Sequence, residues 1–356
     1  MQASPFILSF YFLALGFGTI LTLTSTHWFL GWMGLEIATI AILPLLAGDH
    51  HPRATEAALK YFMIQISAAS LLLFACLLNA WLTGEWGISQ ETHPIPASMI
   101  IIALALKMGL SPLHAWLPEV LQGLKLTIAM VVVTWQKLAP IALLYQMELN
   151  NPLLFSSLAI MSMITGAWGA LNQTQLRKIL AYSSIAHLGW VVLILQFSTP
   201  LALLALFTYF ILTIALFLIL NWKTTLSINA LASSSAKTPL LMVLTPLVLL
   251  SLGGLPPLTG FAPKWLTLLE LTKQSLPLLA VVAALTSLLS LYFYFRLMIA
   301  AALFMAPSIT AYFVPSRLPS LNFKLPAMAF VTAAILLMPV CPTLFTTFIM
   351  NTPDFA

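Results

Sequence analysis

Long apolar runs follow one another along the whole chain of 356 residues, and they constrain its fold more than any other feature. A helix that crosses a lipid bilayer needs about 20 apolar residues at a rise of about 1.5 Å each, and most of the runs reach that length. Only 6% of the residues are charged, against about 25% in soluble proteins. The chain is therefore predicted to be an all-α, polytopic transmembrane helix bundle, which excludes an ordinary soluble enzyme, a nucleic-acid binder and a disordered scaffold.

Hydropathy divides the chain into about 11 apolar segments. The predicted spans are 4–24, 28–46, 57–82, 97–121, 127–147, 152–171, 180–197, 200–221, 240–272, 276–305 and 325–349. The connections between them are short and often contain Pro, Gly or Asn, which favour turns. No connection is long enough to form a soluble domain, so we expect all chemistry to lie within or between the helices.

The charges in the connections are unevenly divided between the two sides of the predicted bundle. Side A, which follows even-numbered spans, holds the basic residues Arg53, Lys60, Lys125, Arg177, Lys178, Lys223, Lys237, Arg296, Arg317 and Lys324. Side B holds Glu85, Glu91, Glu148, Glu270 and Asp354, with Lys273 as its basic residue. Basic loops remain on the side where a membrane protein is synthesised. We therefore expect the N-terminus on that side and the C-terminus opposite, without a cleaved leader, because Met1 runs almost directly into an apolar segment.

Four charged residues lie in the interior of the predicted spans and are assigned to neither side. They are Glu36, Lys107, Lys137 and Lys264. A charge at bilayer depth costs about 2.5–3.5 kcal/mol on insertion scales, and such residues commonly mark ion or proton pathways. A buried lysine can release and regain its proton near neutral pH, whereas an arginine stays charged. These residues are candidate proton carriers; the alternative is that they form structural ion pairs or extend to the membrane surface.

Two of the predicted spans contain similar proline-rich segments. Residues 109–119 and 254–264 align without gaps and share 5 of 11 residues, including two prolines. Because proline removes a backbone donor and clashes with the preceding turn, each span should break there. Lys107 lies just before the first break and Lys264 just after the second.

The two breaks are separated by an odd number of spans, so the second must have the opposite orientation to the first. Inverted repeats with paired broken helices are typical of secondary transporters. We predict two inverted five-helix repeats, at 1–150 and 151–305, followed by a final connection and C-terminal span at 306–356. The broken helices are predicted at 97–121 and 240–272. The alternative is two proline-kinked helices with no deeper relation.

Several motifs resemble a known family. They include Leu-Lys-Met-Gly-Leu-Ser-Pro-Leu-His-Ala-Trp-Leu-Pro-Glu at 106–119 and Arg-Lys-Ile-Leu-Ala-Tyr-Ser-Ser-Ile-Ala-His-Leu-Gly at 177–189. With Gly-Trp-Met-Gly-Leu-Glu at 31–36 and the motif at 257–265, the chain resembles the antiporter-like subunits of respiratory NADH:ubiquinone oxidoreductase along essentially its whole length. It is most similar to the animal mitochondrial form, which lacks three of the 14 spans of bacterial members. The resemblance implies the mitochondrial inner membrane, with side A in the matrix.

The resemblance also implies roles for particular residues. Glu36 and Lys107 would form a coupled pair, Lys137 would be the central relay, and Lys264 would connect to the other half-channel. His187 would be a bridging proton site, or alternatively an imidazole bonded only to a neighbouring helix. His114 and Glu119 match the same motif but are equally compatible with packing roles, and Lys60 is expected to extend its side chain to the membrane surface.

The implied function is proton translocation by a core membrane subunit of the oxidoreductase, coupled to electron transfer in other subunits. No redox chemistry, cofactor, metal or nucleic acid is expected in this chain; NADH, FMN, Fe–S clusters and ubiquinone would bind elsewhere in the complex. The implied partners are other membrane-arm subunits and membrane lipids. A stand-alone cation/proton antiporter on the same scaffold is the main alternative, and a structural copy with paired lysines is a third.

Overall fold

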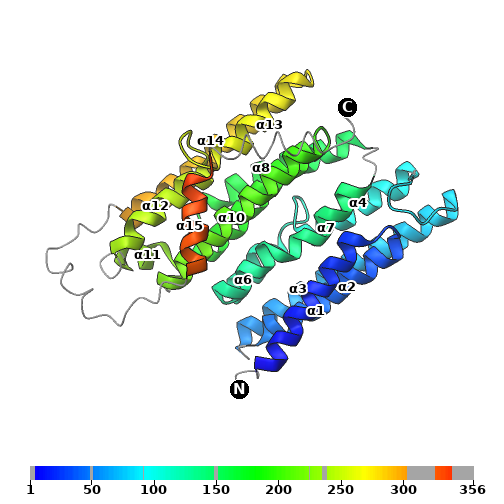
Figure 1. The fold of residues 1–356 in the computed structure, drawn as a ribbon, viewed down its shortest axis with the longest axis horizontal. Helices are drawn as coiled ribbons and strands as arrows, with labels where there is room; N and C mark the ends of the chain where they lie inside the picture. Colours follow the sequence, from blue (N-terminus) through cyan, green and yellow to red (C-terminus); the bar gives the residue numbers. More distant parts are fainter. Residues whose placement is uncertain are drawn as a thin grey trace. The chain divides into compact units, whose positions relative to one another are not determined.

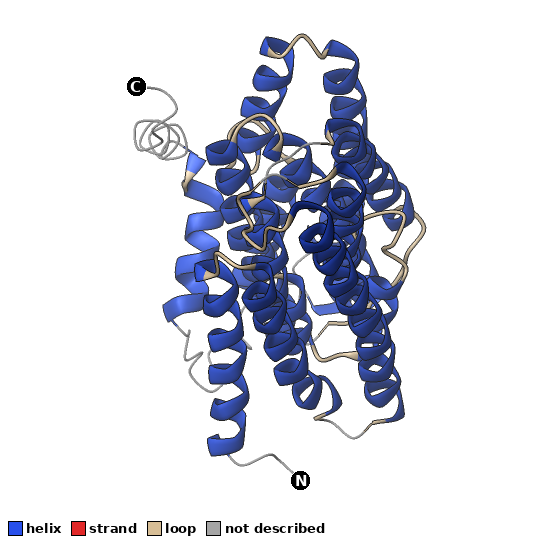
Figure 2. Ribbon diagram, turned by 90° about the vertical axis from the view of Figure 1, so that its right-hand side faces the viewer, coloured by secondary structure: helices blue, strands red, loops and turns tan. Residues whose placement is uncertain are grey.

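The computed structural model describes residues 5–48, 51–90, 92–147, 151–223, 225–234, 239–302 and 325–338. Its regular elements over these residues are helices, joined by loops (Figure 2). The chain divides into two compact units, Met1–Leu158 and Ala159–Ala356. Each unit is described by itself.

The first unit is built on three long helices. They are α1 (Pro5–Thr24), α2 (Trp28–Ala47) and α3 (Pro52–Thr83), and α2 packs against both of the others (Figure 1). Four shorter helices follow: α4 (Pro94–Met108), α5 (Trp116–Gly123), α6 (Leu126–Val133) and α7 (Trp135–Gln146). Helix α3 contacts α4 and α5, while α7 contacts α1, α2 and α4. Helix α8 (Pro152–Ala170) carries the boundary between the units.

The second unit is organised around α10 (Thr199–Lys223), which contacts α9, α12, α13 and α15. The other helices of this unit are α9 (Leu176–Leu195), α11 (Ile228–Ser234), α12 (Pro239–Gly253), α13 (Phe261–Lys273), α14 (Pro277–Ala302) and α15 (Leu325–Leu336). Helix α14 packs against α11, α12 and α13. This arrangement surrounds α10 with helices that reach the proline-rich segment between α12 and α13.

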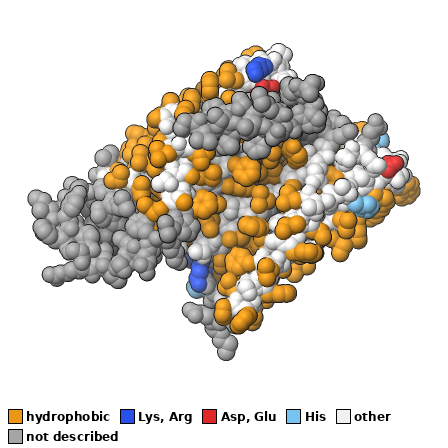
Figure 3. Space-filling model, in the orientation of Figure 1, with side chains coloured by type: hydrophobic (Ala, Val, Ile, Leu, Met, Phe, Trp, Pro, Cys, Tyr) orange, Lys and Arg blue, Asp and Glu red, His pale blue; other side chains and the backbone are white. Residues whose placement is uncertain are grey.

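Eight segments of the described residues are long and apolar enough to cross a membrane, and one of them, Leu126–Gln146, comprises α6 and α7. Many of their large apolar side chains are exposed, including Phe6 and Leu13 of α1, and hydrophobic atoms cover much of the described face in Figure 3. Such a surface is stable in lipid and not in water. The prediction of an all-α, multi-pass membrane protein is confirmed.

Several predicted features lie outside the described residues. They are Glu91, Glu148, Lys237, Arg317, Lys324, Asp354 and the part of the predicted final span after residue 338.

Both predicted helix breaks are present, and both begin with the same helix-ending turn. Residues 109–115 separate α4 from α5, and residues 254–260 separate α12 from α13. Gly109 and Gly254 end the preceding helices with positive φ angles of 76° and 84°, which a side chain disfavours and glycine permits. In each loop, this glycine and the leucine after it donate to the same helix carbonyl, that of Ala105 or of Leu250. The two helices that precede the breaks therefore end in the same way.

Loops that should lie on one side of the membrane pair within each unit. The α1–α2 loop bonds to the α3–α4 loop, since Ile88 donates to the Thr26 carbonyl at 3.0 Å and the His27 ring stacks on Trp86. In the second unit, the loop after α8 pairs with the loop after α10 through an antiparallel bridge between Gln175 and Ser227. These pairings agree with the alternation of sides used to sort the charges.

Candidate functional site

Glu36 and Lys107 form an ion pair in the first unit. The Lys107 Nζ lies 3.2 Å from the Glu36 Oε1, and the two side chains are 1% and 20% exposed. Glu36 lies in the middle of α2, while Lys107 lies in the last turn of α4, immediately before the break. Gln65 of α3 donates to the Lys107 carbonyl, which ties a third helix to the pair. The side chains from α2 and α4 therefore meet, as the resemblance implied.

Lys107 and Lys137 line the same cavity. Its volume is about 10 Å³, and its polar lining includes Tyr61, Gln65 and Gln136. Lys137 is 2% exposed. A volume of this size is close to that of a single water. The first unit therefore brings two buried amines, one carboxylate and neutral hydrogen-bonding groups to one place.

The helix that carries Lys137 is broken, which the sequence analysis did not predict. A continuous span was expected over 127–147, but α6 ends at Val133 and α7 begins at Trp135. The intervening Thr134 bonds through its hydroxyl to the Met130 carbonyl at 2.7 Å. Pro140 inside α7 is the sequence signal that could have indicated irregular backbone here, because it leaves the carbonyl four residues earlier without its usual donor. Lys137 therefore lies between two interruptions of the regular hydrogen-bond ladder.

The first break also contains a buried hydroxyl, four residues after Lys107 in the sequence. Ser111 is 1% exposed, and its Oγ has no hydrogen-bond partner among the described residues. Trp116 closes the other side of the loop by donating to the Leu106 carbonyl at 3.1 Å. A buried hydroxyl in this state commonly binds an ordered water. The break therefore offers a buried hydroxyl to which a water can bond.

Lys264 is held differently from Lys107. It lies in the first turn of α13, and its Nζ donates to the carbonyls of Gly253 at 2.9 Å and Leu252 at 3.4 Å. These carbonyls end α12, where a helix presents unsatisfied acceptors and a partial negative charge. The second break thus holds its lysine by helix-end carbonyls, whereas the first holds its lysine by a carboxylate.

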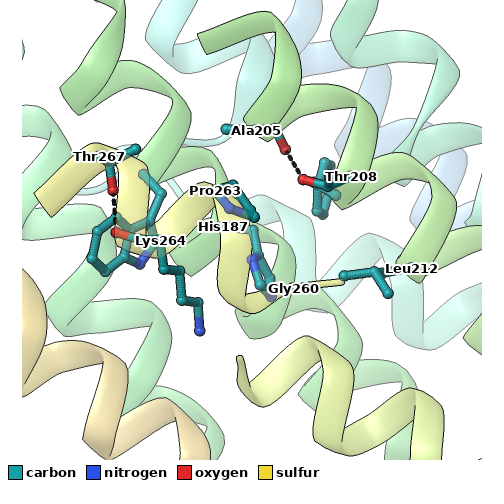
Figure 4. A pocket seen from close by; sticks show the side chains of 10 residues that line it. His187, Ala205, Thr208, Leu212, Gly260, Pro263, Lys264 and Thr267 are labelled. Carbon is teal, nitrogen blue, oxygen red and sulfur yellow. Dashed lines mark hydrogen bonds between the residues drawn. The ribbon is translucent and has the colours of Figure 1, made fainter. Parts of the chain in front are cut away.

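His187 and Lys264 line one cavity in the second unit. Its volume is about 20 Å³, which is enough for a water. The labelled lining residues in Figure 4 come from α9, α10, α13 and the loop before α13. The His187 Nε2 lies 3.1 Å from the Tyr294 hydroxyl, and its ring stacks on Tyr209 with centroids 5.7 Å apart. His187 therefore combines a link to a neighbouring helix with access to the cavity of Lys264.

Three secondary residues also have defined positions. Lys60 forms ion pairs with Glu56 at 2.7 Å and with Glu119 at 2.8 Å, and all three side chains are exposed. Lys60 is thus engaged at the surface near the first break. His114 lies in the loop of that break, between α4 and α5.

Lys223 is a buried lysine that the sequence analysis placed among the loop residues. It is the last residue of α10 and is 6% exposed, and its Nζ lies 3.3 Å from the Thr245 hydroxyl of α12. Lys223 was assigned to a connection because it lies at the end of an apolar run. Hydropathy does not show which residues near a loop are covered by other helices. Among the described residues, no group of three or more His, Cys, Asp or Glu side chains is arranged to hold a metal ion.

Comparison with known proteins places this geometry in a family. Residues 25–290 match the family described as NADH:quinone oxidoreductase/Mrp antiporter, transmembrane, and the chain belongs to it. Among its relatives is NADH-ubiquinone oxidoreductase chain 2 of the fish Tetraodon nigroviridis, which is 56% identical over 345 residues. That match covers 97% of this chain and 99% of the relative.

Solved structures share the fold. A chain of respiratory complex I from Thermus thermophilus is 27% identical with a TM-score of 0.81, and the match covers 97% of this chain and 78% of that one. A chain of the Mrp complex from Dietzia is 17% identical with a TM-score of 0.81, covering 94% of this chain and 75% of that one. The likeness to the Mrp complex concerns the fold alone.

Proposed function

We propose that this chain is a proton-translocating membrane subunit of a respiratory NADH:ubiquinone oxidoreductase of the mitochondrial inner membrane. The observation that carries the proposal is the buried Glu36–Lys107 pair beside the cavity that Lys107 shares with Lys137. The family and the near full-length relatives named NADH-ubiquinone oxidoreductase chain 2 support it. Side A would face the matrix, with the N-terminus on the same side, because basic connections remain on the side of synthesis.

The paired charges provide a means of coupling. While Glu36 holds the Lys107 ammonium, that charge is neutralised and the Lys137 amine can carry a proton next to it at lower electrostatic cost. Separation of the pair would expose Lys137 to an unneutralised positive charge and favour release of its proton. Water bound near Ser111 and in the cavity would conduct the proton. Electron transfer in other subunits would drive the change.

The second unit would continue the transfer through its own polar cavity. Lys264 would exchange a proton with water near His187, and the helix-end carbonyls of Leu252 and Gly253 would stabilise the charged amine. His187 has two ring nitrogens and can accept a proton on one side while donating on the other. The roles of Glu36, Lys107, Lys137, Lys264 and His187 are all part of this proposal.

Substitution of Lys137 tests the function. In the assembled complex, Lys137→Met should lower NADH turnover and proton pumping together, while the complex still assembles, because methionine fills the site but carries no proton. Lys273→Met is the matched control, since this lysine of the second unit has a 74% exposed side chain. Normal coupled activity in the Lys137 variant would refute the relay assignment.

Purification distinguishes the proposal from a stand-alone cation/proton antiporter. A subunit should co-purify with other membrane-arm subunits after mild detergent extraction and lose its transport activity when separated from them. An antiporter should be stable alone and exchange protons for Na⁺ or K⁺ in liposomes. Cation-dependent proton exchange by the isolated chain would favour this alternative.

A further inference from the structure

Lys223 has no role in the proposed pathway, although its burial is similar to that of Lys107. The 6% exposure of this residue contrasts with that of Lys273, the last residue of α13, whose side chain is 74% exposed. Burial of an amine at the end of a helix is costly unless polar groups receive it. A basic residue that only sets the orientation of the chain in the membrane can remain exposed, so the burial of Lys223 requires another physical reason.

Helix α12 connects Lys223 to Lys264. Lys223 bonds to the hydroxyl of Thr245 at 3.3 Å, and Lys264 bonds to the carbonyl of Gly253 at 2.9 Å. These two residues of α12 lie eight positions apart, which corresponds to about 12 Å along a helix. The buried hydroxyl of Ser251 lies between them on the same helix. Two lysine amines, that of buried Lys223 and that of half-buried Lys264, are therefore bonded to the same short helix, one near its middle and one at its end at the break.

A small cavity with an almost wholly apolar lining lies along this helix. The cavity of about 10 Å³ touches Thr245 and Leu249 of α12, and its other walls are leucines of α9, α10, α11 and α14. Beyond Lys223, the Thr225 hydroxyl is buried and has no hydrogen-bond partner in the described part of the chain. Orphaned buried hydroxyls commonly bind water, whereas leucine-lined constrictions conduct only while they are wetted.

The end of the unit where Lys223 lies is also its basic end. The loop after α10 bonds to the loop before α9, which is followed by Arg177 and Lys178. Arg296 near the end of α14 donates to the Leu171 carbonyl in the same loop region. Lys223 is thus the buried basic residue beneath the side A surface of this unit.

We propose that Lys223 is a proton-uptake residue of the second unit, which takes a proton from side A and passes it along α12 to Lys264. The neutral Lys223 amine accepts the proton from water and returns it to a transient water chain past Thr245 and Ser251. The neutral Lys264 amine then receives it. The leucine-lined cavity acts as a gate, because it interrupts the water chain when dry. This inference rests on the proposed function.

Three substitutions of Lys223 test the inference in the assembled complex reconstituted in liposomes. Lys223→Met and Lys223→Arg should both lower proton pumping by about tenfold or more, since positioned proton-transfer groups commonly contribute about 10²–10⁴-fold. Arginine keeps the charge and donors but does not release its proton. Lys223→His should retain more pumping than either, because imidazole exchanges protons near neutral pH.

The outcomes separate a proton role from a structural one. Normal pumping by the arginine variant would overturn the inference, because charge alone would then suffice, as would normal pumping by the methionine variant. If the arginine variant does not assemble, Thr245→Val provides a second test, because it replaces only the hydroxyl that bonds to Lys223. This variant should slow pumping at least about twofold, and an unchanged rate would count against the route. Normal pumping by the Lys137→Met variant would refute the proposed function itself. If that variant pumps poorly while the Lys223 variants pump normally, only the route through Lys223 is refuted.

Discussion

The Glu36–Lys107 pair allows a test in which stability and transport respond in opposite ways. The perturbation is a double-mutant cycle of Glu36→Gln, Lys107→Met and the combined variant. Glutamine keeps the size of Glu36 and one acceptor oxygen, while methionine keeps the length of the Lys107 stem. Each single variant leaves one buried charge without its partner, and the double variant leaves neither.

The geometry sets the magnitude. Two unit charges 3.2 Å apart attract by about 5 kcal/mol at an effective dielectric constant of about 20. Removing one member of a buried pair typically costs about 3–5 kcal/mol, whereas replacing both with apolar or neutral groups is often nearly neutral. We expect each single variant to lose about 3 kcal/mol or more, and the double variant to recover most of that loss.

The assay combines heating of the assembled complex, followed by native electrophoresis, with proton pumping in liposomes. The double variant should dissociate at a temperature close to that of the unchanged complex but should not regain pumping, because Lys107 is absent. If the double variant is as unstable as the two single variants together, the charges do not stabilise one another and the pairing argument fails. If it pumps normally, the pair is structural only.

Two further predictions concern the second unit. Gly254→Ala should weaken pumping more than Gly109→Ala. Both substitutions introduce a side chain at positive φ, at a cost of about 1–2 kcal/mol. The new Cβ at position 254 would lie 2.9 Å from the Lys264 Cδ and displace its amine, whereas the Cβ at position 109 would meet only the Trp116 and Leu117 side chains. Equal pumping by the two variants would contradict this. Tyr294→Phe removes the hydroxyl 3.1 Å from His187 Nε2 and should slow pumping without altering assembly, as measured by initial rates of acidification; an unchanged rate would remove the bond from the pathway.

Hydropathy and proline chemistry predicted most of the fold. The spans expected at 4–24 and 152–171 correspond closely to α1 and α8, because a long apolar run in lipid has no alternative to a helix. Both broken helices were predicted from their prolines. The interruption at Thr134 was not, since no glycine or proline occupies that position and Pro140 lies several residues later.

The site was less accessible to sequence reasoning. Scarcity of charge identified Glu36 and Lys107, but they are 71 positions apart and no local pattern joins them; the resemblance supplied their pairing. Lys223 was misjudged because its burial depends on contacts with α12, which are tertiary. The charged residues within a span can be counted from the sequence, whereas the burial of a residue at a helix end can be determined only from the fold.

The helices that precede the two breaks end in the same pair of main-chain hydrogen bonds, made by a glycine and the leucine after it. The amine can therefore lie before the break or after it while the preceding helix ends in the same way. Lys107 precedes one break and bonds to a carboxylate, whereas Lys264 follows the other and bonds to backbone carbonyls. A chain with the same helix-ending turn at two places can thus support different acid–base chemistry at each.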